Sequence, residues 1–131
     1  MTPTRKMTDP IVFSNFLFVM NACVWLYVDR VCCAAVVFVS FVASMIYHHY
    51  HEKCRWTLHF DRLSAVVALL TTLYFSYPYL NVLSVAYVTT FLYVSLYIKN
   101  MKGVAYDTKH LVWHICVFAG QLSLASNIPL A

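Results

Sequence analysis

Long stretches without charged residues dominate the chain. No Asp, Glu, Lys or Arg occurs in residues 11–28, 31–47, 63–98 or 111–131. A helix that crosses the hydrocarbon core of a bilayer needs about 20 apolar residues. The stretch at 63–98 is too long for one crossing, because its 36 residues would extend about 54 Å as a straight helix. The segment "SYPYLN" (76–81) interrupts it with a proline and an asparagine, so the pattern predicts two helices joined by a hairpin.

This pattern predicts an all-α fold, a polytopic transmembrane bundle of about five helices that forms one domain over residues 1–131. The expected spans are 11–28, 31–50, 60–77, 80–98 and 109–127. Only Asp29 and Arg30 separate the first two spans. A four-helix arrangement, with the first segment tilted or lying at the membrane interface, is therefore a second interpretation.

Composition supports the membrane assignment. Hydrophobic residues make up 62% of the chain and charged residues 11%, and the mean hydropathy is +0.69. In soluble globular proteins, charged residues make up about a quarter of the chain. The sequence therefore predicts an integral membrane protein whose surroundings, and first partners, are membrane lipids.

The basic residues predict an orientation. With five spans, Arg30 falls on one side of the membrane and eight basic residues on the other: Arg5, Lys6, Lys53, Arg55, Arg62, Lys99, Lys102 and Lys109. Basic residues accumulate on the cytoplasmic side, so we expect a cytoplasmic N-terminus and a C-terminus that is outside or luminal. This asymmetry accounts for the net charge of +4. Nucleic acid is therefore not an expected partner, while oligomerisation is compatible with the sequence.

A few polar residues lie at or inside the expected spans, where polar groups are costly and usually face the protein interior. They are Ser44, His48, His49 and His51 in the second span, Asp61 in the third, and His110 and His114 in the fifth. Ser44 precedes His48 by four residues, and the same spacing separates His110 from His114, so each pair shares a helical face. Because the spans alternate in direction, His48, Asp61 and the last two histidines are expected at similar depth near one leaflet.

Three histidines from two helices suggest a metal site. Three neutral imidazoles suit a tetrahedral metal with one open position, an arrangement typical of catalytic zinc. Asp61 adds a carboxylate that can orient a ligand or accept a proton. The small residues Ser64, Ala65, Ala68 and Thr72 follow it on the same span and favour close packing, which turns Asp61 inward. The alternatives are half-hydrated histidines at the interface and an Asp61 paired with Arg62.

Three short segments resemble the signature elements of the CREST superfamily, which includes alkaline ceramidases, progestin and adipoQ receptors and myomaker-like proteins. They are "SMIYH" (44–48), "FDRLSA" (60–65) and "KHLVWHICVFAG" (109–120), and "HLVWH" is most similar to the myomaker-like branch. The resemblance implies a zinc held by His48, His110 and His114, with Ser44 and Asp61 beside the bound water. In its characterised enzymes the family hydrolyses lipid amides. Its members have seven helices, with three between the Asp helix and the last helix, where this chain is expected to have one.

The leading functional hypothesis is a zinc-dependent membrane hydrolase acting on a lipid amide or ester. Asp61 would accept a proton from water, and Ser44 would hydrogen-bond the developing oxyanion or a ligand. The alternative is a non-catalytic receptor-like or membrane-remodelling protein in which zinc only joins helices. A haem site is less favoured, since two histidines four residues apart suit one small ion. His49 and His51 are assigned to the interface, with His51 as a substitute zinc ligand or a partner of one.

Overall fold

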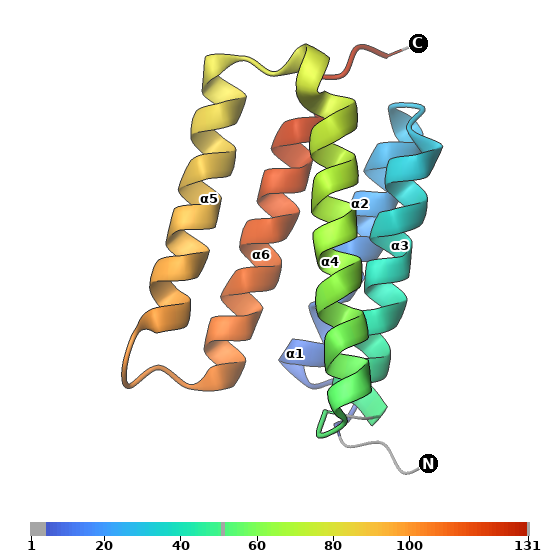
Figure 1. Ribbon diagram of the computed structural model, residues 1–131. Coiled ribbons are helices and arrows are strands. Elements are labelled where there is room, and N and C mark those ends of the chain that lie inside the picture. The colour runs from blue at the N-terminus through green and yellow to red at the C-terminus, as the bar shows by residue number, and fades with distance from the viewer. Residues whose placement is uncertain (1–4, 51, 131) are drawn as a thin grey trace.

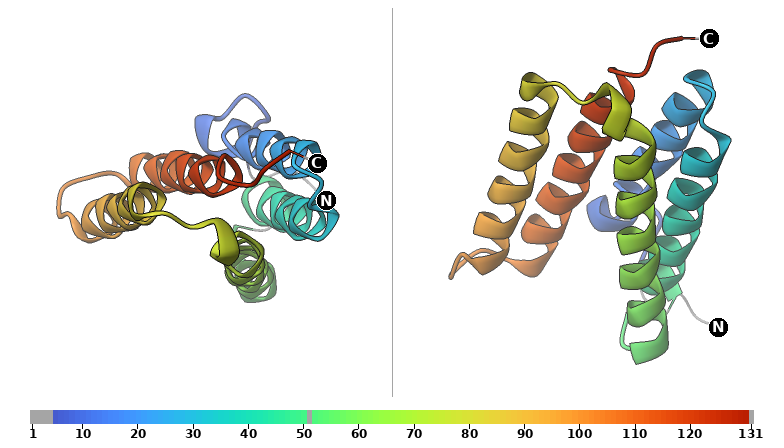
Figure 2. Two further views of the ribbon diagram at one scale, coloured as in Figure 1. Left: turned by 90° about the horizontal axis from the view of Figure 1, so that it is seen from above. Right: turned by 45° about the horizontal axis from the view of Figure 1, so that its top comes forward.

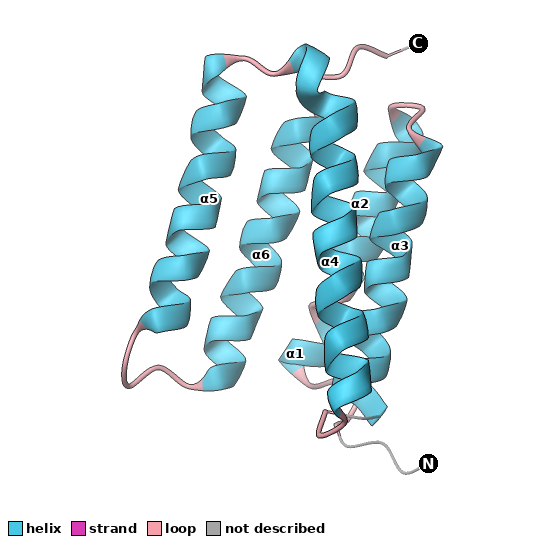
Figure 3. Cartoon of the chain, in the orientation of Figure 1, coloured by secondary structure: helices cyan, strands magenta, loops and turns pink. Residues whose placement is uncertain are grey.

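The computed structural model describes residues 5–50 and 52–130, and every regular element in this part of the chain is a helix (Figures 1 and 3). In chain order the elements are α1 (Pro10–Phe13), α2 (Phe16–Tyr27), α3 (Val31–Met45), the π-helix η1 (Ile46–Tyr50), α4 (Arg55–Ser76), the 3₁₀-helix η2 (Tyr77–Tyr79), α5 (Val82–Asn100) and α6 (Tyr106–Ala125). The all-α prediction is confirmed. The helices match the five expected spans, although α4 begins at Arg55 rather than at residue 60 and α6 at Tyr106 rather than at residue 109.

Four helical segments of the described chain are long and apolar enough to cross a membrane. They are Pro10–Tyr27, Val31–Tyr50, Arg55–Tyr79 and Val82–Asn100. The helix α6 has a similar length but is more polar, because it carries Asp107, Lys109, two histidines and Gln121. These lengths and compositions are those of a multi-pass membrane protein.

The first span is one bent unit. Asp9 caps α1 by accepting a hydrogen bond from the backbone N–H of Ile11, and Pro10 occupies the first helical turn, where its missing N–H is not needed. Ser14 and Asn15 separate α1 from α2 while keeping near-helical backbone angles. The unit packs against α3 and α6. This packing inside the bundle favours the five-helix interpretation over an interfacial first segment.

The connection between α2 and α3 is a tight turn at Asp29. This residue has φ of 56°, in the left-handed region, and the N–H of Arg30 donates to the carbonyl of Trp25 at 2.8 Å. Such a left-handed residue followed by a long backward hydrogen bond is a Schellman ending of a helix. It lets the chain reverse direction within two residues and run back as α3.

The helices α2, α3, α4 and α6 surround the apolar core, and α5 stands outside it. The core contains Phe18, Ala22, Trp25 and Val28 from the first unit and its following turn, Cys33, Ala34 and Val37 from α3, Ala68 from α4, and Leu124, Ala125 and Ile128 from α6 and beyond. In the views along and across the bundle, α6 lies between α2 and α5, and α4 lies beside α3 (Figures 1 and 2). The helix α6 is therefore the central one.

The loops that carry the basic residues gather at one end of the bundle. The segment before α1, the connection between η1 and α4 and the connection between α5 and α6 all lie there, and the turn at Asp29 and Arg30 lies at the other end (Figure 1). We call the end that carries these three loops the basic end. Since η1 and the start of α6 both lie at the basic end, the histidines of the two segments come to the same level.

Candidate metal centre

His48, His110 and His114 meet in the interior at the basic end. Each offers one ring nitrogen, and these nitrogens all lie within 4.8 Å of one another. The Nε2 atoms of His48 and His110 are 2.8 Å apart, and the ring centroid of His114 is 4.5 Å from that of His110. His48 is fully buried and His114 is 2% exposed. The structure thus brings together the three residues that the sequence singles out as metal ligands.

His48 owes its position to η1. In a π-helix the turn is wider than in an α-helix, and such turns are frequent at functional sites. Tyr47, His48 and His49 are three consecutive residues, and all are buried. Within η1, His48 faces α6, and the ring of His49 packs edge-on against Tyr50 with centroids 4.4 Å apart. His49 is therefore a buried neighbour of the cluster, and His51 lies outside the described residues.

Ser14 determines which nitrogen of His114 is free. Its Oγ lies 2.6 Å from Nδ1 of His114 and 3.0 Å from the carbonyl oxygen of Ile11. The hydroxyl has one proton, which it donates to the carbonyl, so it accepts a hydrogen bond from Nδ1–H of His114. Nε2 of His114 then carries a lone pair. This is the ligand form of a neutral histidine, with the other ring N–H held by an oxygen outside the cluster.

The other two histidines have similar partners. Nδ1 of His48 lies 3.4 Å from Oε1 of Glu52, and an ionised carboxylate can only accept, so Nδ1 carries the proton. Nδ1 of His110 lies 3.5 Å from the hydroxyl of Tyr106. In each of the three rings, Nδ1 contacts an oxygen. For His48 and His110, whose Nε2 atoms face each other, this leaves Nε2 directed into the cluster.

The donor set fits a metal ion. The Nε2 atoms of His48 and His110 lie at hydrogen-bond distance, 2.8 Å. With Nδ1 of His48 protonated, its Nε2 accepts a hydrogen bond from Nε2–H of His110, and a metal ion that binds both nitrogens replaces this proton. Zinc bonded to tetrahedral ligands at about 2.1 Å sets the ligand nitrogens about 3.4 Å apart. One pair of nitrogens in the cluster is 2.8 Å apart and no pair is more than 4.8 Å apart, so small movements of the rings would bring them to this value.

Ser44 and Asp61 form a separate pair. Their side chains interact with each other, and Asp61 is partly buried between α4 and α3. Ser44 precedes His48 by four residues, so the pair lies about one helical turn from His48 along the second span. Further along α4, Ser64, Ala68 and Thr72 are buried as the small-residue stripe predicts. Asp61 thus faces the interior. Its carboxylate is not among the clustered ligand atoms, which belong to the three histidines.

Arg5 connects the segments that carry the cluster. Its Nε lies 3.0 Å from both carboxylate oxygens of Glu52, and its Nη1 and Nη2 lie 2.9 Å from the two oxygens of Asp107. Nη1 also contacts Asp9 at 3.1 Å. The hydrogen bonds to Asp107 and Glu52 raise the pKa of Arg5, and Arg5 holds the pKa of Asp107 below its usual value. We call these four residues the Arg5 clamp.

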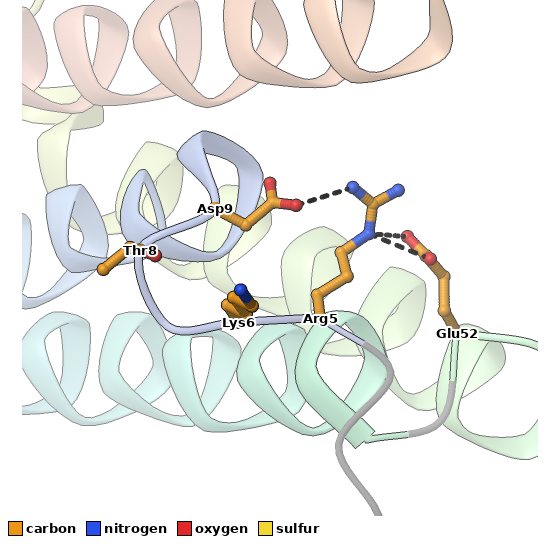
Figure 4. Close-up of a pocket in the computed structure, with 5 residues that line it drawn as sticks. All are labelled: Arg5, Lys6, Thr8, Asp9 and Glu52. Carbon is orange, nitrogen blue, oxygen red and sulfur yellow. Dashed lines mark hydrogen bonds and ion pairs between the residues drawn. The ribbon is translucent and has the colours of Figure 1, made fainter.

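A surface pocket of about 490 Å³ adjoins the Arg5 clamp. It is lined by Arg5, Lys6, Thr8, Asp9 and Glu52, and the guanidinium of Arg5 lies between the carboxylates of Asp9 and Glu52 (Figure 4). Glu52 therefore contacts both the pocket and His48. The pocket thus lies one side chain away from the buried His48.

The sequence analysis did not identify the three residues that contact the histidine rings, which are Ser14, Glu52 and Tyr106. Glu52 follows His48 by four residues and Tyr106 precedes His110 by four, so the same spacing that identified the histidines could have indicated both. Ser14 carries no such signal, because it lies 100 residues before His114. Arg5 likewise meets Asp107 across 102 residues.

Comparisons with known protein families, with curated proteins and with solved structures find no match to this chain. The resemblance to the CREST superfamily therefore depends on the three sequence segments alone.

Proposed function

We propose that this protein is a zinc-dependent membrane hydrolase, a compact relative of the CREST superfamily, that cleaves a lipid amide or ester near the cytoplasmic leaflet. One observation carries the proposal: one ring nitrogen from each of His48, His110 and His114 lies within 4.8 Å of the others. Nδ1 of His114 contacts Ser14 and Nδ1 of His48 contacts Glu52, which suits neutral histidines that bind through Nε2. Three neutral imidazoles leave one position of a tetrahedral zinc open for water or substrate. The basic end faces the cytoplasm in this proposal, in keeping with the distribution of Lys and Arg.

The chemistry divides between the metal and the chain. Zinc, when bound, supplies Lewis acidity toward water and toward a carbonyl oxygen. Asp61 accepts a proton from the attacking water as its oxygen bonds to the carbonyl carbon, and Ser44 hydrogen-bonds the developing oxyanion or a ligand. The bond from carbon to the leaving nitrogen or oxygen then breaks, and the proton passes to the leaving group. The products are a fatty acid and an amine or alcohol.

The test combines metal content with lipid hydrolysis. Protein purified in detergent is analysed for bound metals and then incubated with a lipid extract, and the released fatty acids, amines and alcohols are identified. We expect close to one zinc per chain and release of fatty acid. His114→Ala should lose both, whereas His59→Ala, which alters an exposed histidine outside the cluster, should retain both. Wild-type protein without zinc would end the metal proposal.

A structural zinc is the second candidate function. The near-complete burial of His48 and His114 favours it, since a metal that only joins helices needs no access for substrate. In that case zinc contributes folding free energy by linking the second span to α6. Zinc-loaded wild type that hydrolyses no lipid, together with a large loss of thermal stability on zinc removal, would favour this candidate over the hydrolase.

A further inference from the structure

Two arginines lie on the outward face of α4 at the basic end. Arg55 and Arg62 are seven residues apart, about two helical turns, so they share one face, and both are exposed. The buried residues of α4 lie on its other side, where the helix packs against α3 and α6. In the view along the bundle, α4 (green) stands at the outer edge (Figure 2). Both arginine side chains therefore face the surroundings of the bundle.

Neither arginine forms an ion pair with another described residue. The chain has five acidic residues, which are Asp9, Asp29, Glu52, Asp61 and Asp107. Three of them bind Arg5, and one lies in the turn at the opposite end of the bundle. Asp61 attracts the adjacent Arg62, but its carboxylate hydrogen-bonds Ser44. The negative charge opposite Arg55 and Arg62 therefore comes from outside the chain.

The arginines lie at the depth of lipid headgroups. The helical segment Arg55–Tyr79 has 25 residues, whereas about 20 residues cross the hydrocarbon core. The surplus places Arg55 outside the hydrocarbon. Arg62 lies deeper, but helical side chains lean toward the N-terminus of their helix, which for α4 is the basic end, and a long arginine side chain can reach the interface. Trp56 is 84% exposed beside Arg55, and exposed tryptophans are typical of this interface.

An apolar surface continues from the arginines toward the membrane centre. Val66 and Leu70 follow Arg62 at intervals of four residues on the same face, and they are 52% and 61% exposed. Leu63 flanks them and is 63% exposed. Positive charge at headgroup level beside an apolar surface matches both parts of an anionic phospholipid, its charged headgroup and its hydrocarbon chains. A soluble anion would match only the first part.

We propose that Arg55 and Arg62 bind the headgroup of an anionic phospholipid whose chains lie along the outer face of α4. Guanidinium groups donate paired hydrogen bonds to phosphate oxygens. Lys53, which is exposed just before α4, adds a third positive charge. This surface faces away from the histidine cluster, so the proposal depends neither on zinc nor on lipid hydrolysis.

Lipid binding to the protein in detergent tests the proposal. The probes are ether-linked phosphatidylglycerol and ether-linked phosphatidylcholine with the same chains, because ether links resist a hydrolase of amides or esters. Native mass spectrometry counts the bound lipids during a titration. Each basic residue near an anionic surface contributes roughly fivefold in affinity, so we expect the wild type to bind phosphatidylglycerol about 30-fold more tightly than phosphatidylcholine.

Variants that remove charge locate the binding surface. Arg55→Gln and Arg62→Gln should each reduce the affinity for phosphatidylglycerol about fivefold, and the double variant should bind the two lipids with similar affinity. Lys99→Gln combined with Lys102→Gln is the matched control, since it removes the same charge from exposed residues at the same end of the bundle. This control should keep the preference of the wild type. An excess of glycerol 3-phosphate, which has the charge without the chains, should not displace the lipid.

The other outcomes overturn the proposal. Equal binding of both lipids by the wild type would assign the arginines to another source of negative charge, such as an acidic segment of a partner protein. A preference that survives both arginine substitutions, or that the lysine control also loses, would show that this surface does not select the lipid. Displacement by glycerol 3-phosphate would indicate a site for a small anion. Conversely, an arginine-dependent preference in a protein that cleaves no lipid supports this inference and removes the proposed hydrolase.

Discussion

Oγ of Ser14 lies 2.6 Å from Nδ1 of His114, although 100 residues separate them in the chain. This contact links the break between α1 and α2 to the central helix of the bundle. It fixes the ring orientation of His114 and, through the proton that Ser14 gives to Ile11, fixes its tautomer. The first span thus contributes to the cluster without supplying a ligand.

Removal of this hydroxyl should weaken metal binding. A hydrogen-bond partner of a metal-binding histidine is typically worth about 10- to 100-fold in metal affinity. We therefore expect Ser14→Ala to bind zinc about 10- to 100-fold more weakly, as measured by competition with a chelator of known affinity. Ser95→Ala is the matched control, since Ser95 is equally buried but lies on α5 and donates only to the carbonyl of Leu92. Equal zinc affinity in both variants would contradict the role of Ser14.

The convergence of the ligands could be predicted because of membrane geometry. The alternating direction of the spans brings the end of the second and the start of the fifth to one leaflet, so His48 and His110 had to lie at similar depth. The apolar stretches themselves gave the helices and their approximate limits. The first conclusion depends on whether an odd or an even number of spans separates two residues, and the second depends on the pattern of apolar residues. A single sequence contains both kinds of information.

Other features of the site depend on tertiary packing and carried no local signal. The π-helix around His48 inserts an extra residue into a turn, and nothing in "IYHHY" distinguishes it from an α-helix. The contact of Ser14 with His114 requires the bend between α1 and α2 and the packing of that unit on α6. Asp61 was expected beside the histidines, and its side chain hydrogen-bonds Ser44, so its action on a bound water stays a prediction.

The Arg5 clamp should make stability depend on pH in acid. Arg5 lowers the pKa of Asp107 relative to the unfolded chain, so this carboxylate stabilises the fold above its unfolded pKa of about 3.9. The contribution is lost as the pH falls through the lower, folded pKa. Arg5 itself stays charged throughout. We expect Arg5→Gln to lower stability by about 1 kcal/mol near pH 7, as exposed ion-pair networks do, and the difference from wild type to shrink below about pH 4.

Thermal unfolding in detergent at a series of pH values measures this effect. Lys6→Gln removes the same charge from the exposed neighbouring residue and serves as the control. Its difference from wild type should be small and should not follow the titration of Asp107. If the difference in stability between Arg5→Gln and wild type stayed constant from pH 7 to pH 3, the proposed effect of the Arg5 clamp on Asp107 would be wrong.

The orientation of the basic end can be tested by cysteine labelling. In a variant without the five native cysteines, Lys102→Cys lies in the loop between α5 and α6, and Leu130→Cys lies after α6 at the opposite end. We expect a membrane-impermeant maleimide to label position 130 on intact cells and position 102 only after permeabilisation. Labelling of position 102 on intact cells would reverse the proposed topology.

Asp61 should matter for chemistry more than for folding, because the three histidines can hold zinc without it. Asp61→Asn keeps the shape of the side chain and a hydrogen-bonding group for Ser44 while removing the base. We expect near-stoichiometric zinc and normal expression, with loss of most lipid hydrolysis. A positioned base typically contributes about 10²- to 10⁴-fold to the rate. Asp29→Asn is the control, since Asp29 lies in the turn at the far end, where Asn tolerates the left-handed backbone. If Asp61→Asn hydrolyses lipid as fast as wild type, another residue accepts the proton and the role proposed for Asp61 is wrong.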